Sequence, residues 1–252
     1  MVPARLLPLV VALLASPGAR AVDDAGAWAE LAPTTVTARR REEDLPEVPL
    51  AVTALDAAAL DAYGVDDLGE LDALVPNLTI YAARGASSTV TAYIRGVGQS
   101  DPLWGVDPGV GIYVDDVYVA RPQGALLDLL DVERIEVLRG PQGTLYGKNT
   151  IGGTINVITQ KPTNEFRGEA AVLYGNLGFD QESLTVSGPI VADKVLALVS
   201  ALHKSRDGYI YNRFTKKDIN GYEGEGIRGR VLVMPIEGLK LDFSGDYYHQ
   251  DG

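Results

Sequence analysis

The spacing of hydrophobic and polar positions changes several times along the chain, and each change marks a different kind of segment. The first 21 residues contain one apolar run, residues 6–15, which follows Arg5 and precedes Ala19-Arg20-Ala21. This order is typical of a secretory signal peptide with a small-residue cleavage site. The run has about ten residues, whereas a transmembrane helix needs about 20. A short N-terminal membrane anchor is the alternative interpretation.

Residues 22–47 have no hydrophobic period. Pro33 and Pro46 lie in this stretch, and a basic run at 39–41 is followed by an acidic run at 42–44. Such a stretch lacks the apolar face that would dock it, so the pattern predicts an extended tail.

Two short helices and a set of short strands are expected in the next domain, residues 48–161. Thr53 and Asp56 resemble a capping box for a first helix that Gly64 can end. Leu68, Leu71 and Leu74 share one face of a second helix that stops before Pro76. Apolar runs between Gly, Pro, Asp and Asn residues then predict an α+β domain with strands at Leu78–Tyr81, Val90–Ile94, Val110–Val114, Val117–Ala120, Ile135–Leu138 and Thr154–Thr159.

Residues 162–252 show a longer alternation of apolar and polar positions. Leu239, Leu241, Phe243, Gly245 and Tyr247 fall on one face of a predicted strand, opposite Lys240, Asp242, Ser244, Asp246 and Tyr248. Ile227, Val231 and Val233 similarly oppose Arg228 and Arg230. Strands with one apolar face can line the core of a soluble β-sandwich. They can also form a membrane barrel, in which the apolar face contacts lipid and the polar face lines the lumen. Residues 166–252 are enough for about five strands of roughly ten residues. An open sheet of that size would expose unpaired backbone N–H and C=O groups at its edges to lipid. On the membrane interpretation the barrel is therefore incomplete within these 252 residues, and we expect the natural gene to continue in frame.

The amino-acid composition and the motifs argue against several classes of function. The 252 residues include no Cys and two His, which excludes disulfide frameworks and thiolate metal sites and leaves His-based catalysis poorly supplied. A net charge of −12 argues against a nucleic-acid partner. The stretch at 143–150 superficially suggests a phosphate loop, but Gln142 and Asn149 stand where such a loop needs Gly and Ser or Thr. Asp115-Asp116 is interpreted as a solvated pair in a turn and not as a calcium site. We expect no enzyme, no cofactor and no bound metal.

Three stretches resemble the TonB-dependent outer-membrane receptors, particularly the ferric-siderophore branch. They are TTVTARRREEDLPEVPLAVTAL at 34–55, TAYIRGVG at 91–98, and PGVGIYVDDVYVARPQGALLDLLDVERIEVLRGPQGTLYGKNTIGGTINVITQKP at 108–162. The resemblance implies an α+β plug domain inside a 22-strand barrel, of which this chain holds the plug and about five strands. It also implies a TonB box in the N-terminal tail at Thr34, Thr35, Val36, Thr37 and Ala38. An untethered tail without a partner is the alternative.

The resemblance assigns two arginines and several turn positions. Arg95 and Arg139 match plug arginines that, in the family, face barrel glutamates; ordinary surface arginines are the alternative. Buried arginines of that kind need acidic partners. Turn positions that require unusual backbone angles or close approach, and that we interpret as structural, are Gly140, Pro141, Gly143, Gly147, Gly152 and Gly153.

The function implied by the resemblance is active uptake of a scarce ligand across the Gram-negative outer membrane, with a ferric siderophore as the expected ligand. TonB with ExbB and ExbD would supply the energy, membrane lipid would surround the barrel, and iron would enter only as part of the transported chelate. Uptake of cobalamin, haem or a glycan by the same mechanism is an alternative. A signal-transducing receptor is another alternative; such members carry an additional folded domain before the box, whereas only about a dozen residues precede the box here. A secreted soluble β-rich binding module is a further alternative.

Overall fold

The computed structural model describes residues 34–82, 89–100, 106–120 and 131–251. The predicted signal peptide at 1–21 and residues 22–33 of the predicted tail lie outside these residues. The described residues belong to one compact unit that begins at Thr34. Among them, no helix combines the length and the apolar character needed to cross a membrane.

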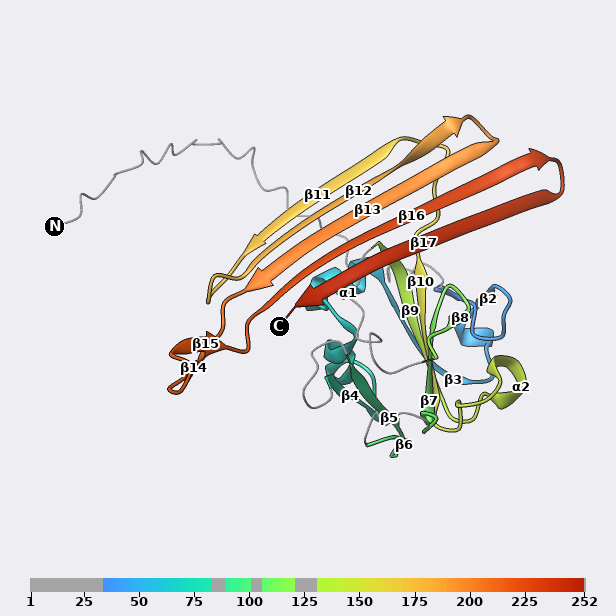
Figure 1. The fold of residues 1–252 in the computed structure, drawn as a ribbon. Helices are drawn as coiled ribbons and strands as arrows, with labels where there is room; N and C mark the ends of the chain where they lie inside the picture. Colours follow the sequence, from blue (N-terminus) through green and yellow to red (C-terminus); the bar gives the residue numbers. More distant parts are fainter. Residues whose placement is uncertain (1–33, 83–88, 101–105, 121–130, 252) are drawn as a thin grey trace, which may run out of the picture. The chain divides into compact units, whose positions relative to one another are not determined.

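A five-stranded mixed sheet organises the first domain (Figure 1). Its central strand β10 pairs in parallel with β7 on one side and antiparallel with β9 on the other. The strand order is β3-β9-β10-β7-β8. The strands are β3 (Ala51–Asp56), β7 (Val110–Val114), β8 (Val117–Tyr118), β9 (Val132–Arg139) and β10 (Gly153–Thr159).

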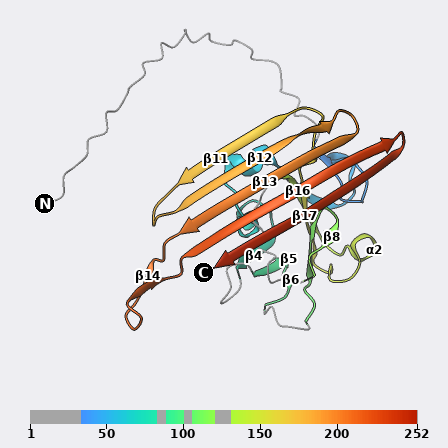
Figure 2. The ribbon, with the colours of Figure 1, turned by 45° about the horizontal axis from the view of Figure 1, so that its top comes forward.

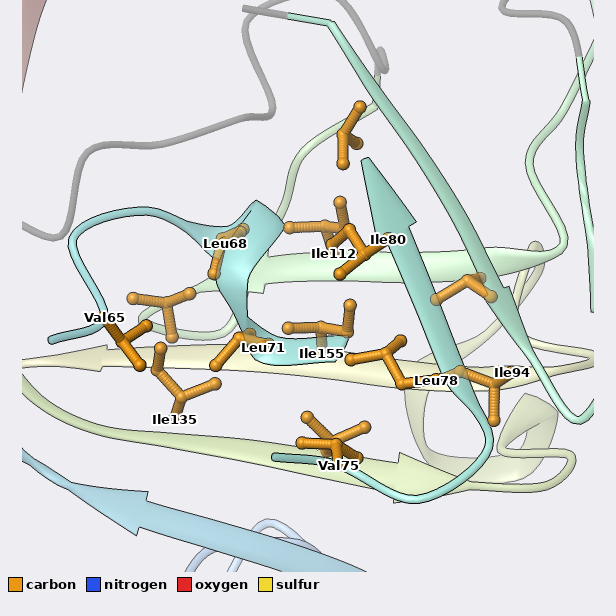
Figure 3. Packing of buried hydrophobic residues seen from close by; sticks show 14 of the residues in the cluster. Val65, Leu68, Leu71, Val75, Leu78, Ile80, Ile94, Ile112, Ile135 and Ile155 are labelled. Carbon is orange, nitrogen blue, oxygen red and sulfur yellow. The ribbon is translucent and has the colours of Figure 1, made fainter. Parts of the chain in front are cut away.

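One face of this sheet packs against two helical segments and a small second sheet. The helical segments are α1 (Ala57–Tyr63) and the 3₁₀ helix η2 (Leu68–Ala73), and the small sheet consists of β4 (Leu78–Ala82), β5 (Val90–Ile94) and β6 (Val97–Gly98). Figure 3 shows Leu68 and Leu71 of η2 and Ile80 of β4 packing close to Ile112, Ile135 and Ile155 of the sheet. These side chains are at most 5% exposed. The predicted helices and strands thus combine in a single α+β core.

The first helix begins later than predicted. Residues 51–56 pair with β9 as strand β3, so that Asp56 becomes the N-cap of α1 and accepts a hydrogen bond from Ala59 N at 2.8 Å. Gly64 ends the helix with a left-handed backbone, as predicted. The second helix forms around a capping box of Asp67 and Glu70 but as a 3₁₀ segment. Pairing with a distant strand therefore overrides the local helix signal at Thr53.

The second domain is an antiparallel sheet of five long strands, which lie side by side in Figure 2. They are β11 (Arg167–Tyr174), β12 (Asp180–Val191), β13 (Val195–Arg206), β16 (Tyr222–Ile236) and β17 (Leu239–Asp251). A small hairpin of β14 (Ile210–Asn212) and β15 (Lys217–Ile219) lies in the connection from β13 to β16. The sheet is open, with β11 and β17 at its two edges.

The two faces of this sheet differ in the way the alternating pattern predicts. One face carries large apolar side chains that are exposed, among them Val172, Leu184, Val199, Ile227 and Phe243. The other face carries Arg228 and Arg230 together with buried Ser200, Leu198 and Leu232. An apolar face exposed over several neighbouring strands, with charged residues on the opposite face, is the arrangement of strands in a membrane barrel.

Candidate functional site

The predicted partner-binding residues 34–38 are not a free tail in this structure. Thr35–Val36 forms strand β1, which pairs antiparallel with β2 (Glu43–Asp44), and a 3₁₀ turn η1 (Leu45–Glu47) follows. Val36 and Ala38 are completely buried. The prediction of an extended tail over residues 22–47 was therefore wrong for residues 34–47, because these residues supply apolar side chains to the second face of the sheet.

Residues 34–50 cover that second face. Three of their side chains, Val36, Ala38 and Val48, are buried and form one cluster with Tyr113, Leu138 and Tyr146 of the domain. Val52 and Ala54 of the edge strand pack against the same cluster. The segment that resembles a TonB box is thus part of a packed layer, and removing it would expose apolar surface of the sheet.

A buried carboxylate holds the centre of this segment. Glu136 on β9 is completely buried, and its Oε1 accepts hydrogen bonds from Thr37 N at 2.7 Å and Thr37 Oγ1 at 3.1 Å. Arg134 donates to the same oxygen through Nε at 2.9 Å and to Thr37 Oγ1 through Nη2 at 3.3 Å. The main chain of residue 37 is therefore bound by a charged group, which makes a stronger hydrogen bond than a neutral acceptor.

Tyr146 fixes the end of the segment. Its hydroxyl donates to the carbonyl oxygen of Ala38 at 3.1 Å and accepts from Asn156 Nδ2 at 2.8 Å. The hydroxyl of Tyr113 donates to the carbonyl of Tyr146 at 2.6 Å, and the two rings meet edge to face. Burial raises the pKa of Tyr146 to about 12, so the hydroxyl remains a donor.

In the run of charges at residues 39–44, all three arginines and Glu43 form ion pairs within the fold. Arg39 and Arg41 both contact Glu43, and their hydrogen bonds lower the pKa of that carboxyl to about 2. Arg40, which has a positive φ of 56°, forms an ion pair with Asp116 at 3.3 Å. Its Nε also donates to Leu145 O at 3.0 Å. These contacts close the turn between β1 and β2 and attach it to the short helix α2 (Gly143–Tyr146).

Arg95 and Arg139 lie near one another at Gly140. Arg95 is exposed with a φ of 53°, and its Nη1 lies 3.5 Å from the position that a Cβ would occupy at residue 140. Arg139 Nη1 donates to Pro76 O at 3.5 Å. Among the described residues no carboxylate lies within ion-pair distance of either guanidinium. Their assignment to barrel glutamates stays a prediction.

The predicted turn glycines differ in what the backbone demands of them. Gly140 and Gly147 have positive φ, and at Gly153 the φ is 148° and a Cβ would lie 2.1 Å from Leu138 O. At Gly152 a Cβ would lie 2.7 Å from Val97 O. Gly143 has neither constraint, which corrects the expectation for that position, and Pro141 is exposed.

A buried ionic contact that the sequence did not indicate joins the two domains. Arg230 of β16 is 6% exposed and forms a bidentate pair with Asp242, with Nε–Oδ1 at 2.9 Å and Nη2–Oδ2 at 2.8 Å. Its Nη1 reaches Asp115 Oδ2 at 3.2 Å and Thr159 Oγ1 at 2.9 Å. The expectation that Asp115 is solvated was wrong, since it also accepts from Thr159 N at 2.9 Å.

Two further residues of the site escaped prediction for a definite reason. Glu136 stands between Ile135 and Val137, and Arg134 stands two positions earlier, so both occupy one face of an alternating strand that local pattern assigns to solvent. One sequence signal indicated that this face is buried: Leu138, which lies on the same face as Glu136 and Arg134, is apolar. Within the described residues no group of three or more His, Asp or Glu side chains is placed to hold a metal ion.

Known proteins resemble this chain over most of its described length. Residues 44–154 match the family profile of the TonB-dependent Receptor Plug Domain. The pesticin receptor of Yersinia pestis is 34% identical over 169 residues, which is 66% of this chain and 24% of that protein. The ferripyoverdine receptor of Pseudomonas aeruginosa is 27% identical over 197 residues, or 74% of this chain and 23% of that protein. The vitamin B12 transporter of Vibrio vulnificus is 24% identical over 211 residues, or 83% and 34%.

Solved structures resemble the fold as well. The ferric yersiniabactin uptake receptor of Yersinia pestis superposes with a TM-score of 0.73 and 29% identity, covering 80% of this chain and 32% of that one. The Pseudomonas aeruginosa ferripyoverdine receptor gives a TM-score of 0.71 at 21% identity, covering 86% and 27%, which shows likeness of fold. The chain spans about a quarter to a third of the length of these relatives.

Proposed function

We propose that this chain, which belongs to the TonB-dependent outer-membrane receptors, takes part in TonB-dependent uptake of a ferric siderophore. The plug domain and the five antiparallel strands are parts of such a receptor, and the family consists of receptors and transporters and not of enzymes. We place the protein in the outer membrane of a Gram-negative bacterium, with the plug in the barrel lumen and residues 34–38 facing the periplasm.

The observation that carries the proposal is the conformation of residues 34–38. Thr35–Val36 is an extended strand of two residues that pairs with only one neighbour among the described residues, and residues 34–38 precede the matched plug domain, which starts at residue 44. An extended segment binds a partner by adding to the edge of a sheet, chiefly through main-chain hydrogen bonds. TonB would engage this segment in that way.

The energy for transport would come from the inner membrane. TonB, with ExbB and ExbD, would transmit the proton gradient as a pull on residues 34–38. Because the chain continues from these residues into β3, the edge strand of the central sheet, a pull would reach that sheet along the main chain. The coupling is mechanical and leaves the ligand chemically unchanged.

The names of the relatives support an iron chelate as ligand. The ferripyoverdine receptor and the ferric yersiniabactin uptake receptor both carry iron in the names of their ligands. Iron would then be part of the cargo, with no resident cofactor. The vitamin B12 transporter among the relatives makes cobalamin the competing ligand. Growth of a strain that lacks the gene, under iron limitation and separately on cobalamin, distinguishes them: a defect confined to cobalamin would overturn the siderophore proposal.

Two substitutions at one position test the role of residues 34–38. Thr35→Pro removes a main-chain donor on the edge of β1 that β2 does not cover, whereas Thr35→Ala shortens an exposed side chain and keeps the donor. In cells that express the gene containing this chain, we expect Thr35→Pro to abolish ligand uptake while surface binding remains, and Thr35→Ala to retain uptake. Unchanged uptake by the Pro variant, with ligand binding intact, would contradict the assignment.

A further inference from the structure

We infer that the Glu136 carboxylate controls access to residues 34–38, because it occupies the main-chain edge on which a partner strand would have to pair. This inference rests on the proposed role of these residues in binding TonB, and it identifies Glu136 as a positioning residue for that role. The observation behind this inference is the hydrogen bond that Thr37 N donates to Glu136 Oε1 at 2.7 Å.

Strand β1 has two edges, and only one of them is covered by β2. Thr35 is opposite Asp44 and Val36 is opposite Glu43, and Leu45 N donates to Thr34 O at 2.9 Å. In an antiparallel pair, alternate residues direct their main-chain groups toward the partner. Thr34 and Val36 therefore face β2, while the main-chain groups of Thr35 and Thr37 point to the opposite edge.

Glu136 binds the donor on this opposite edge. Thr37 N is committed to Glu136 Oε1, and a carboxylate at that point also repels the carbonyl oxygens of any approaching strand. A charged group placed at a strand edge is a general means of preventing unwanted pairing. A strand that adds here must first displace Glu136, so TonB can pair fully only after this contact has opened.

The contact is strong but incompletely satisfied. Oε1 accepts from Thr37 N, Thr37 Oγ1 and Arg134 Nε, whereas Oε2 is buried and has no hydrogen-bond partner among the described residues. A buried carboxylate with one unpartnered oxygen lowers the stability of the docked arrangement. The two donors of Thr37 can separate from the carboxylate together, while Arg134, on the same strand as Glu136, keeps its own contact with it.

A thiol at position 36 makes access to the segment measurable, because these 252 residues contain no cysteine. Val36→Cys introduces it at a completely buried position, in the receptor expressed from the whole gene with any cysteine elsewhere replaced by serine. Glu136→Gln preserves shape but removes the charge. We expect it to accelerate alkylation of the thiol at position 36 about tenfold, as for loss of a charge-assisted hydrogen bond. Thr37→Val removes the two contacts of Oγ1, with Glu136 and Arg134, but keeps the main-chain contact, so it should accelerate alkylation less.

Two controls separate release of the segment from general loosening. Glu133→Gln removes the same charge from the same strand at a half-exposed site that also contacts Arg134, and it should leave alkylation unchanged. Val137→Cys, buried on the other face of the sheet, should stay protected in the Glu136→Gln background. Equal alkylation of the thiol at position 36 with and without Glu136→Gln would overturn the inference. So would equal acceleration at position 137.

Binding of the purified periplasmic domain of TonB, measured without engineered thiols, distinguishes this inference from the proposed function. We expect Glu136→Gln to raise the affinity by up to about tenfold. Unchanged affinity, with faster alkylation at position 36, would overturn Glu136 as a control of TonB access. No binding to any variant, including the unsubstituted receptor, would overturn the proposed function, while faster alkylation would still establish that Glu136 holds the segment.

Discussion

The hydroxyl of Tyr146 donates a hydrogen bond to the carbonyl oxygen of Ala38, which lies 108 positions earlier in the chain, at 3.1 Å. Both residues are buried, and the Tyr146 hydroxyl also accepts a hydrogen bond from Asn156 Nδ2. The last residue of the predicted TonB box is therefore attached to the plug by a side chain from α2. Docking of the segment depends on this contact at one end and on Glu136 at its centre.

Tyr146→Phe should loosen the segment without disturbing the sheet. The substitution leaves Ala38 O and Asn156 Nδ2 without this hydroxyl in a buried site, and it should lower the free energy of unfolding of the plug by about 1–3 kcal/mol. Tyr63→Phe, at a position that is 65% exposed, is the matched control and should change it by less than about 0.5 kcal/mol. Chemical denaturation followed by a plug-specific probe measures both. Equal stability of the two variants would show that the Tyr146 contact is not needed for docking.

Arg230→Lys should weaken the attachment of the plug to the strands although the charge is kept. A lysine cannot form the bidentate pair with Asp242 and reach Asp115 and Thr159 at the same time. We expect a loss of about 2–4 kcal/mol in the free energy of unfolding, because the cation at the buried position 230 would lose several of its partners. Arg167→Lys, at an exposed pair, should cost less than about 1 kcal/mol. A similar small effect at both positions would contradict the role given to Arg230.

The stability of the plug should depend on pH through Asp131. Burial raises the pKa of this carboxyl from 3.8 to about 6, nearby Asp115 also raises it, and Arg228 and Ser200 act in the opposite direction. Between these two pH values the folded state binds the proton and the unfolded state has lost it. The free energy of unfolding should therefore fall by about 2–3 kcal/mol as the pH rises from about 4 to 6, and then stay level.

Asp131→Asn isolates this effect because the amide does not titrate. Its stability should show no change of that size between about pH 4 and 6, and at about pH 7 it should equal or exceed that of the unsubstituted protein. Unfolding in urea at about pH 4.5 and about pH 7 measures the difference. The same decrease with pH in the Asn variant would assign the dependence to another group.

Two glycines in one turn region should respond oppositely to alanine. At Gly153 the φ of 148° and the 2.1 Å approach to Leu138 O leave no room for a methyl group, so Gly153→Ala should destabilise the plug by at least about 2 kcal/mol. Gly143→Ala lies in α2 with open space around it and should be neutral, or stabilising by up to about 1 kcal/mol. Comparable losses at both positions would show that the turn geometry differs from the one described.

Local pattern located the strands well where apolar runs are bounded by turn residues. Val90–Ile94 and Val110–Val114 have the predicted bounds, and the alternation around Ile227 and Phe243 predicted the two faces of the second sheet. These features depend on neighbouring residues alone. The order of strands in the plug sheet, where β10 lies between β9 and β7, could not be obtained in this way.

The parts that escaped prediction depend on distant partners. Val36 and Ala38 are buried because Tyr113, Leu138 and Tyr146 meet them, and nothing near residue 36 indicates this. Glu136 and Arg230 were overlooked for the same reason, since an isolated charge in an alternating strand is ordinarily solvated. Their partners Thr37 and Asp115 lie 99 and 115 positions away.

Disulfide cross-linking between the receptor and TonB tests directly whether residues 34–38 bind TonB. A single cysteine is introduced in turn at Thr35, Thr37, Thr53 and Ser183, in a chain that has no cysteine of its own, and a cysteine is scanned along the periplasmic domain of TonB. We expect cross-links from positions 35 and 37 in the presence of ligand, and none from 53 or 183. Cross-links absent from positions 35 and 37, in a receptor that still takes up its ligand, would contradict this assignment.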